Sequence, residues 1–320
     1  MHYLSLALAL AAVAIAWAGP QPGNNGPSPS PGPIAVDAVS VPLNPRDPSA
    51  ISIGEFRYAG GLALRADESD LLHELSDLVV TDNDHIVAVG DEGVLFNARI
   101  TFDKNGHLVG IADANIARLI GENGRPLMTD VDAEGLALLP SGDFLVSFER
   151  RPRIWLYPKT GAPPRAVPSP RASFRANEGM EALTADPDSG ADAYVVGAEE
   201  SGATWNCRAT TTCIPGPSVD KPTEFGLVSM TRLPEGMTAY LLRAYDSSRG
   251  ARITLKILRG QSLVARLDLA PPMTVDNFEG IASVLATDGQ RRRFYMVSDD
   301  NNSPSQRTLL LAFDWLPKSK

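Results

Sequence analysis

The chain has 320 residues, of which 43% are hydrophobic and 21% are charged, and its formal net charge at pH 7 is −9. This acidic balance argues against nucleic acid or an anionic membrane surface as the main partner, because both repel a negatively charged protein. A site lined by Asp and Glu also repels a phosphate or carboxylate substrate unless a cation lies between them.

The first 18 residues are typical of a cleaved secretory signal peptide. Leu4–Ile15 is an apolar run of about a dozen residues, which is too short to span a bilayer, and Ala16-Trp17-Ala18 is a small-x-small cleavage site. The segment has no Lys or Arg, so an uncleaved anchor is the alternative. The sequence predicts a signal peptide at 1–18, a secreted or periplasmic protein, and no membrane span after cleavage.

Residues 19–50 are dominated by Pro, Gly, Ser and Asn, a composition that cannot bury enough apolar surface to order itself. We therefore predict a linker at 19–50. The remaining residues, 51–320, show no second change of composition, and their number is normal for a single all-β domain. We predict one domain at 51–320.

Short strand-like runs separated by turn residues fill this domain, whereas helical periodicity is hard to find. Leu136–Leu139, for example, turns at Pro140-Ser141-Gly142-Asp143 into Phe144–Phe148. Units of about three strands recur with a loose period near fifty residues, which is typical of propeller blades. A β-sandwich is the alternative, but it has no reason to repeat acidic residues.

Five such units are visible in the sequence. A sixth blade can be assembled from Ile51–Leu64 joined to the C-terminal strands, or from Val109–Leu119. We predict an all-β protein, a β-propeller with six blades, with five blades as the alternative. Pairing of the two ends of the chain would close the ring and remove exposed edge strands.

The two cysteines, Cys207 and Cys213, lie six positions apart in the sequence. In an exported protein such a close pair indicates a disulfide that closes a small loop. A metal or redox role is the minor alternative, because no CxxC motif or neighbouring His accompanies them.

An acidic Glu-Gly pair stands just before a short apolar run in three of the units. The three phrases are Asp132-Ala133-Glu134-Gly135, Asn177-Glu178-Gly179-Met180-Glu181 and Asp276-Asn277-Phe278-Glu279-Gly280. The innermost strand of a propeller blade runs beside the central channel, so acids at the start of these strands are expected to converge at one mouth. Oxygen ligands without Cys and with scarcely any His favour a hard cation, calcium first and magnesium second.

The pattern therefore predicts a metal site, a catalytic role for Glu134 and Glu279, and a role for the Arg150 guanidinium in gripping an anionic group. The predicted metal ligands are Asp132, Glu134, Glu178, Glu181, Asp276, Glu279 and Asp299. The alternative is structural: the buried glutamates accept backbone N–H bonds from a neighbouring blade and staple the ring, and Arg150 pairs with a nearby acid. Asp91 and Asp299 can equally serve as turn residues.

An ordered series of motifs carries a family resemblance from about Phe56 to Phe313. The series is Ser76-Asp77-Leu78, Asp91-Glu92-Gly93, Asp132-Ala133-Glu134-Gly135, Ser147-Phe148-Glu149-Arg150, Asn177-Glu178-Gly179-Met180-Glu181, Asp276-Asn277-Phe278-Glu279-Gly280 and Ser298-Asp299-Asp300-Asn301. It resembles the phytase-like family, which is described as having esterase-like activity. The resemblance implies a secreted or periplasmic β-propeller related to calcium-dependent propeller phytases.

We expect an exported hydrolase that uses a metal, in the first place calcium, to cleave a small-molecule phosphoester or related ester. A lactonase or sugar-ester hydrolase using the same metal is a narrower possibility. The alternative from another class is a non-catalytic propeller that binds a ligand or an envelope protein. The sequence has no Gly-x-Ser-x-Gly elbow, Walker loop or dinucleotide fingerprint, which argues against a serine hydrolase and against nucleotide cofactors.

Overall fold

The computed structural model describes residues 32–82, 84–174, 179–286 and 289–316. These residues contain 23 β-strands, which confirms the all-β prediction. The signal peptide predicted at 1–18 and the first part of the predicted linker lie outside the described ranges. Within those ranges, no helix has the length and apolar character needed to cross a bilayer.

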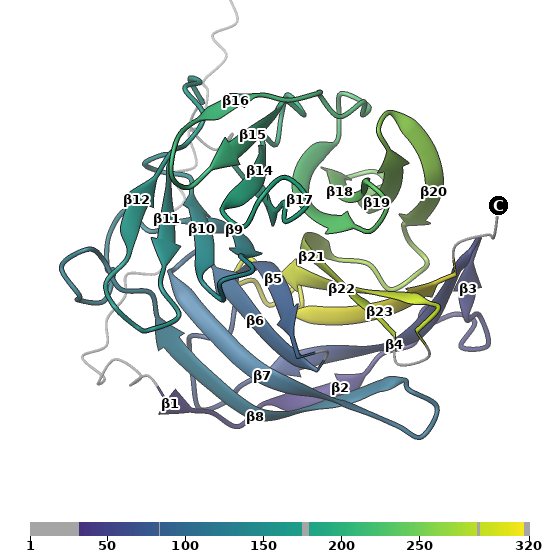
Figure 1. Cartoon of the computed structure of the whole chain (residues 1–320). Helices are drawn as coiled ribbons and strands as arrows, with labels where there is room; N and C mark the ends of the chain where they lie inside the picture. The colour runs from purple at the N-terminus through teal and green to yellow at the C-terminus, as the bar shows by residue number, and fades with distance from the viewer. Residues whose placement is uncertain (1–31, 83, 175–178, 287–288, 317–320) are drawn as a thin grey trace, which may run out of the picture. The chain divides into compact units, whose positions relative to one another are not determined.

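The strands form five antiparallel sheets placed around a shared centre (Figure 1). The first sheet contains β5 (Leu75–Thr81), β6 (His85–Gly90), β7 (Val94–Phe102), β8 (Leu108–Arg118) and β1 (Gly32–Pro33). The second contains β9 (Ala133–Leu138), β10 (Phe144–Phe148), β11 (Arg153–Tyr157) and β12 (Arg165–Val167). The third contains β13 (Ala182–Ala185), β14 (Ala193–Gly197), β15 (Thr204–Arg208) and β16 (Cys213–Pro215).

The fourth and fifth sheets complete the ring. The fourth contains β17 (Gly226–Leu233), β18 (Met237–Asp246), β19 (Gly250–Arg259) and β20 (Ser262–Leu269). The fifth contains β21 (Asn277–Leu285), β22 (Arg292–Asp299), β23 (Leu309–Trp315), β4 (Phe56–Arg65) and β2 (Asp37–Ser40), and β3 (Ser52–Ile53) also pairs with β4. The innermost strands of the five sheets are β5, β9, β13, β17 and β21. Each contacts the next in this order, and β21 contacts β5. The protein is therefore a β-propeller with five blades.

The six-blade prediction is wrong, and the five-blade alternative is confirmed. The segment 51–64 does not start a blade of its own, because most of it lies in β4, which pairs with β23 in the fifth blade. The segment 109–119 lies mostly in β8, the fourth strand of the first blade. The predicted joining of the two ends of the chain is confirmed, with Phe56 opposite Trp315.

The hydrophobic core lies between neighbouring sheets. Phe56, Phe294 and Trp315 are fully buried, and their ring centroids are 6.1 to 6.5 Å apart. Every residue of β23 is buried, since this strand lies between β22 and β4 in its own sheet and has both faces covered. Burial on both faces explains why β23 is apolar at every position except Asp314, rather than alternating between apolar and polar residues.

Part of the stretch predicted as a linker has regular structure. Strands β1 and β2 lie within 32–40, where they pair with β8 and β4. Leu43 is 2% exposed and belongs to a core cluster, and its carbonyl accepts a hydrogen bond from the Thr274 backbone N–H at 2.8 Å. The scattered apolar residues of this segment therefore cover the first and fifth blades despite its Pro-rich composition.

The predicted disulfide between Cys207 and Cys213 is present. It joins β15 to β16 at the outer edge of the third blade, where the two residues are cross-strand partners. Such a bond agrees with an extracytoplasmic protein.

Candidate metal centre

The acidic Glu-Gly phrase forms a β-bulge at the start of the inner strand. In β21, Phe278 pairs with Ser298 and Gly280 with Val297, which leaves Glu279 as the extra residue. The register of β9 shifts in the same way at Glu134-Gly135. A bulge re-aims a side chain, so the glutamate can turn toward the end of the ring.

Glycine follows the glutamate because neighbouring inner strands approach closely at that point. A Cβ on Gly135 would lie 2.5 Å from the carbonyl oxygen of Glu181, on the next blade. A Cβ on Gly280 would lie 2.7 Å from the Cα of Asp77. The glycines therefore allow the strands to close around the axis, and the glutamates beside them reach the mouth.

Carboxylates from three blades meet at this mouth. Oxygens of Asp91, Glu134 and Glu279 all lie within 4.8 Å of one another. A second group, Asp132, Glu134 and Glu149, meets the same criterion, so Glu134 belongs to both. Because the strands of a blade are antiparallel, the start of the inner strand lies beside the end of the second strand, and both ends contribute acids.

Arg243 of β18 supplies a guanidinium to the same mouth. It donates hydrogen bonds to Glu279, to the Asn277 side-chain oxygen at 2.8 Å and to Glu199 at 3.1 Å. Asn277 in turn donates to Glu279 at 2.8 Å and to Asp299 at 3.0 Å. Burial would lower the pKa of Arg243, but Glu279, Glu181 and Glu199 raise it, so this side chain stays charged.

Burial is the main cause of raised carboxyl pKa values at the mouth, and repulsion between the acids adds to it. The pKa of Glu134 is raised well above its ordinary value by burial and then by Asp91 and Glu279. Burial raises the pKa of Asp91 to about 7. Burial likewise raises the pKa values of Asp299 and Glu149 to about 6. These groups are poised to hold protons or a cation.

A buried carboxylate of β5 lies where the inner strands of several blades meet. Asp77 is 1% exposed, and its Oδ2 accepts the Leu136 backbone N–H of the second blade at 2.8 Å. Its Oδ1 accepts the Leu78 N–H and the Ser229 hydroxyl of the fourth blade, both at 2.9 Å. Ser229 Oγ accepts the Ile281 N–H of the fifth blade at 3.2 Å. The stapling considered for the glutamates is therefore performed by Asp77.

A cavity of about 810 Å³ opens beside the carboxylates, between the fourth and fifth blades. The cavity is lined by Glu199, Arg243 and Asn277. Arg243 and Asn277 also donate hydrogen bonds to Glu279, so the cavity adjoins the carboxylate cluster. Tyr245, which also lines it, is 73% exposed. A small organic molecule would fit in this space with one end at Arg243.

Comparison with known families gives a match over residues 71–302 to the phytase-like family, whose description is esterase-like activity of phytase. The chain belongs to the phytase-like family. No curated protein matches this phytase-like chain.

Similar solved structures are remote from this phytase-like propeller in sequence. The major allergen Mala s 1 of Malassezia sympodialis has 12% identity and a TM-score of 0.45, with 87% of this chain and 96% of that chain covered. A catalytically inactive virginiamycin B lyase from Staphylococcus aureus with quinupristin has 12% identity and a TM-score of 0.43, with coverage of 88% and 95%. A streptogramin B lyase has 8% identity and a TM-score of 0.42, with coverage of 90% and 89%.

The phytase-like propeller brings together most of the acids named from the sequence. Asp132, Glu134 and Glu279 lie in the two oxygen groups. Glu181, which is 9% exposed, interacts electrostatically with Glu134 and Glu279, and its pKa is raised well above its ordinary value, first by burial. Asp299 is joined to Glu279 through Asn277.

The remaining predicted site residues, Asp276, Arg150 and Glu178, do not belong to the oxygen groups of the described residues. Asp276 accepts the Arg307 backbone N–H at 3.2 Å and belongs to neither oxygen group. Arg150 is 69% exposed at its side chain and donates to Asp132 at 2.9 Å, which matches the alternative that it pairs with a nearby acid. Glu178 lies outside the described residues.

Several residues of the phytase-like site escaped sequence reasoning. The sequence allows a turn role for Asp91, and it assigns no role to Glu149, Glu199 or Arg243. A signal was present, since the second strand of each blade ends at or just before a charged residue near the mouth, except that Arg243 lies within its strand. The acids at or just after these strand ends are Asp91, Glu149, Glu199 and Asp299, and Asp299 is one of the ligands predicted from the sequence.

Proposed function

We propose that this phytase-like propeller is an exported hydrolase that uses calcium to cleave phosphoesters or related esters of small molecules. The observation that carries the proposal is the position of Glu134 in two carboxylate groups at the mouth of the ring. The family description, esterase-like activity of phytase, supports ester chemistry. The disulfide and the signal peptide predicted from the sequence support export.

The donor set fits a hard divalent cation. Both groups around Glu134 offer carboxylate oxygens and contain neither sulfur nor imidazole. Calcium accepts six to eight such oxygens in flexible geometry, and magnesium is the second choice. A bound divalent cation would polarise a phosphoryl or acyl oxygen and lower the pKa of a coordinated water.

The residues around the mouth divide the remaining tasks. Glu149, with a pKa raised to about 6 by burial and neighbouring acids, can take up a proton near neutral pH, as a general base must. Arg243 presents a cation to the cavity, where it can orient an anionic substrate. Arg150 pairs with Asp132, one of the clustered acids, and its side chain is exposed enough to reach a substrate group.

The test uses purified protein with p-nitrophenyl phosphate, p-nitrophenyl acetate and a lactone, each with calcium and with EDTA. We expect hydrolysis of at least one substrate that depends on calcium. Glu134→Gln and Glu279→Gln should lower this activity by roughly 10- to 100-fold. Glu68→Gln, at an exposed carboxylate that belongs to neither oxygen group, is the matched control and should retain it. Activity that is indifferent to EDTA and to Glu134→Gln would refute the proposal.

A second candidate is a non-catalytic propeller in which the acids and any cation only add rigidity. Its support is that Arg243 already pairs with Glu279 and Glu199, so part of the acidic charge is balanced internally. In that case calcium raises the thermal unfolding temperature, Glu134→Gln abolishes the rise, and none of the three substrates is hydrolysed.

A further inference from the structure

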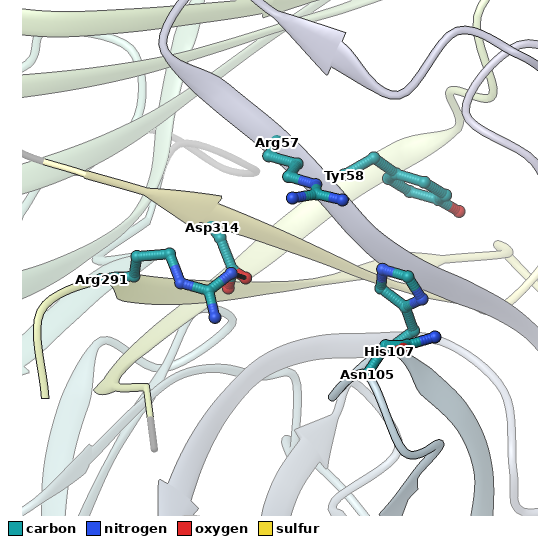
Figure 2. A pocket seen from close by; sticks show the side chains of 6 residues that line it. All are labelled: Arg57, Tyr58, Asn105, His107, Arg291 and Asp314. Carbon is teal, nitrogen blue, oxygen red and sulfur yellow. Dashed lines mark hydrogen bonds and ion pairs between the residues drawn. The ribbon is translucent and has the colours of Figure 1, made fainter. Parts of the chain in front are cut away.

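A second cavity lies at the opposite end of the fifth blade from the carboxylates. Strand β22 runs from Arg292 to Asp299, with Asp299 at the acidic mouth, whereas Arg291 at its other end lines this cavity. The cavity has a volume of about 650 Å³ and lies between β4 and β23 on one side and the β7–β8 turn on the other. Its lining residues are Arg57, Tyr58, Asn105, His107, Arg291 and Asp314 (Figure 2).

Guanidinium groups outnumber carboxylates in the cross-strand row beneath this cavity. Arg57, Asp314 and Arg293 are opposite one another on β4, β23 and β22. Asp314, 3% exposed, accepts two hydrogen bonds from Arg293 at 2.7 and 2.9 Å and one from Arg291 at 2.7 Å. Within the described part of the chain, Arg57 has no side-chain hydrogen bond or ion pair. The carboxylate is fully engaged by two other arginines, so the charge of Arg57 is not balanced by it.

The opposite wall of the cavity is held in place. Arg293 donates to the Gly106 carbonyl at 2.6 Å and so ties the β7–β8 turn to the fifth blade. Asp103 accepts the backbone N–H groups of Asn105 and His107, both at 2.8 Å, and lies 3.4 Å from the His107 ring. Figure 2 shows His107 and Asn105 across the cavity from Arg291 and below Arg57. The donors are therefore positioned before any ligand arrives, which lowers the cost of binding.

Only part of the lining is suited to an anion. The Tyr58 hydroxyl donates to the Val41 carbonyl at 2.6 Å and is therefore engaged elsewhere. Arg57 is exposed and offers the planar fork of donors that matches phosphate oxygens. Such a basic cavity is not a consequence of composition, because the chain as a whole carries a net charge of −9.

We propose that this cavity binds the phosphate group of a small phosphorylated molecule, with Arg57 as its main contact and His107 and Asn105 as further donors. The volume exceeds that of a phosphate ion, which leaves room for the organic part of the molecule. The site is distinct from the carboxylates at the other mouth and does not depend on their function.

The test measures binding of glucose 6-phosphate by isothermal titration calorimetry at low salt in EDTA, with glucose as the uncharged control ligand. EDTA keeps cations from the carboxylates, which then repel phosphate. We expect glucose 6-phosphate to bind, glucose not to bind, and Arg57→Gln to weaken binding at least about tenfold. Arg65→Gln is the matched control: it lies on the same strand at its other end, is exposed, and should bind like the wild type.

Two further measurements separate this proposal from the hydrolase proposal. Glu134→Gln should leave binding unchanged, and added salt should weaken binding in the wild type. The inference would be overturned if the wild type does not bind glucose 6-phosphate or if Arg57→Gln binds it as well as the wild type. It would also be overturned if Glu134→Gln loses binding while Arg57→Gln keeps it. Failure of the hydrolase assay has no bearing on it.

Discussion

Replacing the axial carboxylate should destabilise the whole ring. Asp77→Ala removes the acceptor of three hydrogen bonds, of 2.8, 2.9 and 2.9 Å, whose donors are buried on three blades. Each orphaned buried donor costs about 1–3 kcal/mol, which sums to about 3–9 kcal/mol. Burial also raises the pKa of Asp77 well above its ordinary value, so its removal relieves a desolvation cost. We therefore expect a loss of about 3–5 kcal/mol in the free energy of unfolding.

The assay is urea unfolding followed by tryptophan fluorescence, with Trp155, Trp205 and Trp315 of the propeller as probes. Ser229→Ala should cost less, about 1–3 kcal/mol, because it removes one bond to Asp77 and the acceptor of one backbone N–H. Asp67→Ala is the control, since its ion pair is exposed and is worth at most about 1 kcal/mol. If Asp77→Ala does not fold, Asp77→Asn keeps the shape and turns an amide N–H toward a donor. Asp77→Ala or Asp77→Asn as stable as Asp67→Ala would refute an axial staple.

Three further predictions concern pH, charge and the disulfide. Folded-state pKa values of about 7 for Asp91 and about 6 for Asp299 exceed their unfolded values near 4, so the folded protein holds more protons in that window. The free energy of unfolding in EDTA should therefore fall from pH 5 to pH 8. Calcium at 100 times its Kd should raise it by about 2.7 kcal/mol. A melting temperature in EDTA that rises from pH 5 to pH 8 would contradict the raised pKa values. Arg243→Met should cost about 3–5 kcal/mol at pH 8 in EDTA. The cost should be smaller at pH 5, because burial raises the pKa of its partner Glu279 well above the ordinary value and this carboxyl then holds a proton; a pH-independent loss would show that lost packing dominates. Reduction of the bond between Cys207 and Cys213 should cost at most about 2 kcal/mol in urea unfolding, because the closed loop is short, and a larger loss would mean that it holds more than one hairpin.

The fold class could be predicted from the sequence, because short apolar runs and turn residues are local features. The blade number was not, because it depends on a pairing between the two ends of the chain. Nothing local in Phe56–Arg65 distinguishes a strand that opens a blade from one that completes another beside β23. The periodic runs gave the five blades, and the sixth arose from treating Ile51–Leu64 or Val109–Leu119 as a further unit.

The carboxylates at the mouth were partly predictable, because some of them belong to a motif that repeats in the sequence. Glu134 and Glu279 recur in one phrase, and a repeat places equivalent residues together. Arg243 occurs once, inside an apolar strand, and its role appears only when the blades are side by side. Asp77 occupies the bulge position that Gly135 and Gly280 occupy in two of the phrases, which is a signal in the sequence, but its partners lie on other blades.

The pairing of β4 with β23 determines when the molecule can finish folding. Because β23 follows the other 22 described strands and β4 precedes most of them, the fifth sheet stays incomplete until residues 309–315 are available. Until then β4 has no partner on that side and offers an open edge to other chains. Contacts between residues so distant in sequence form slowly, so the nascent protein passes through a partly folded state that is prone to aggregation. Shortening the chain before Leu309 should thus yield aggregates rather than a smaller propeller.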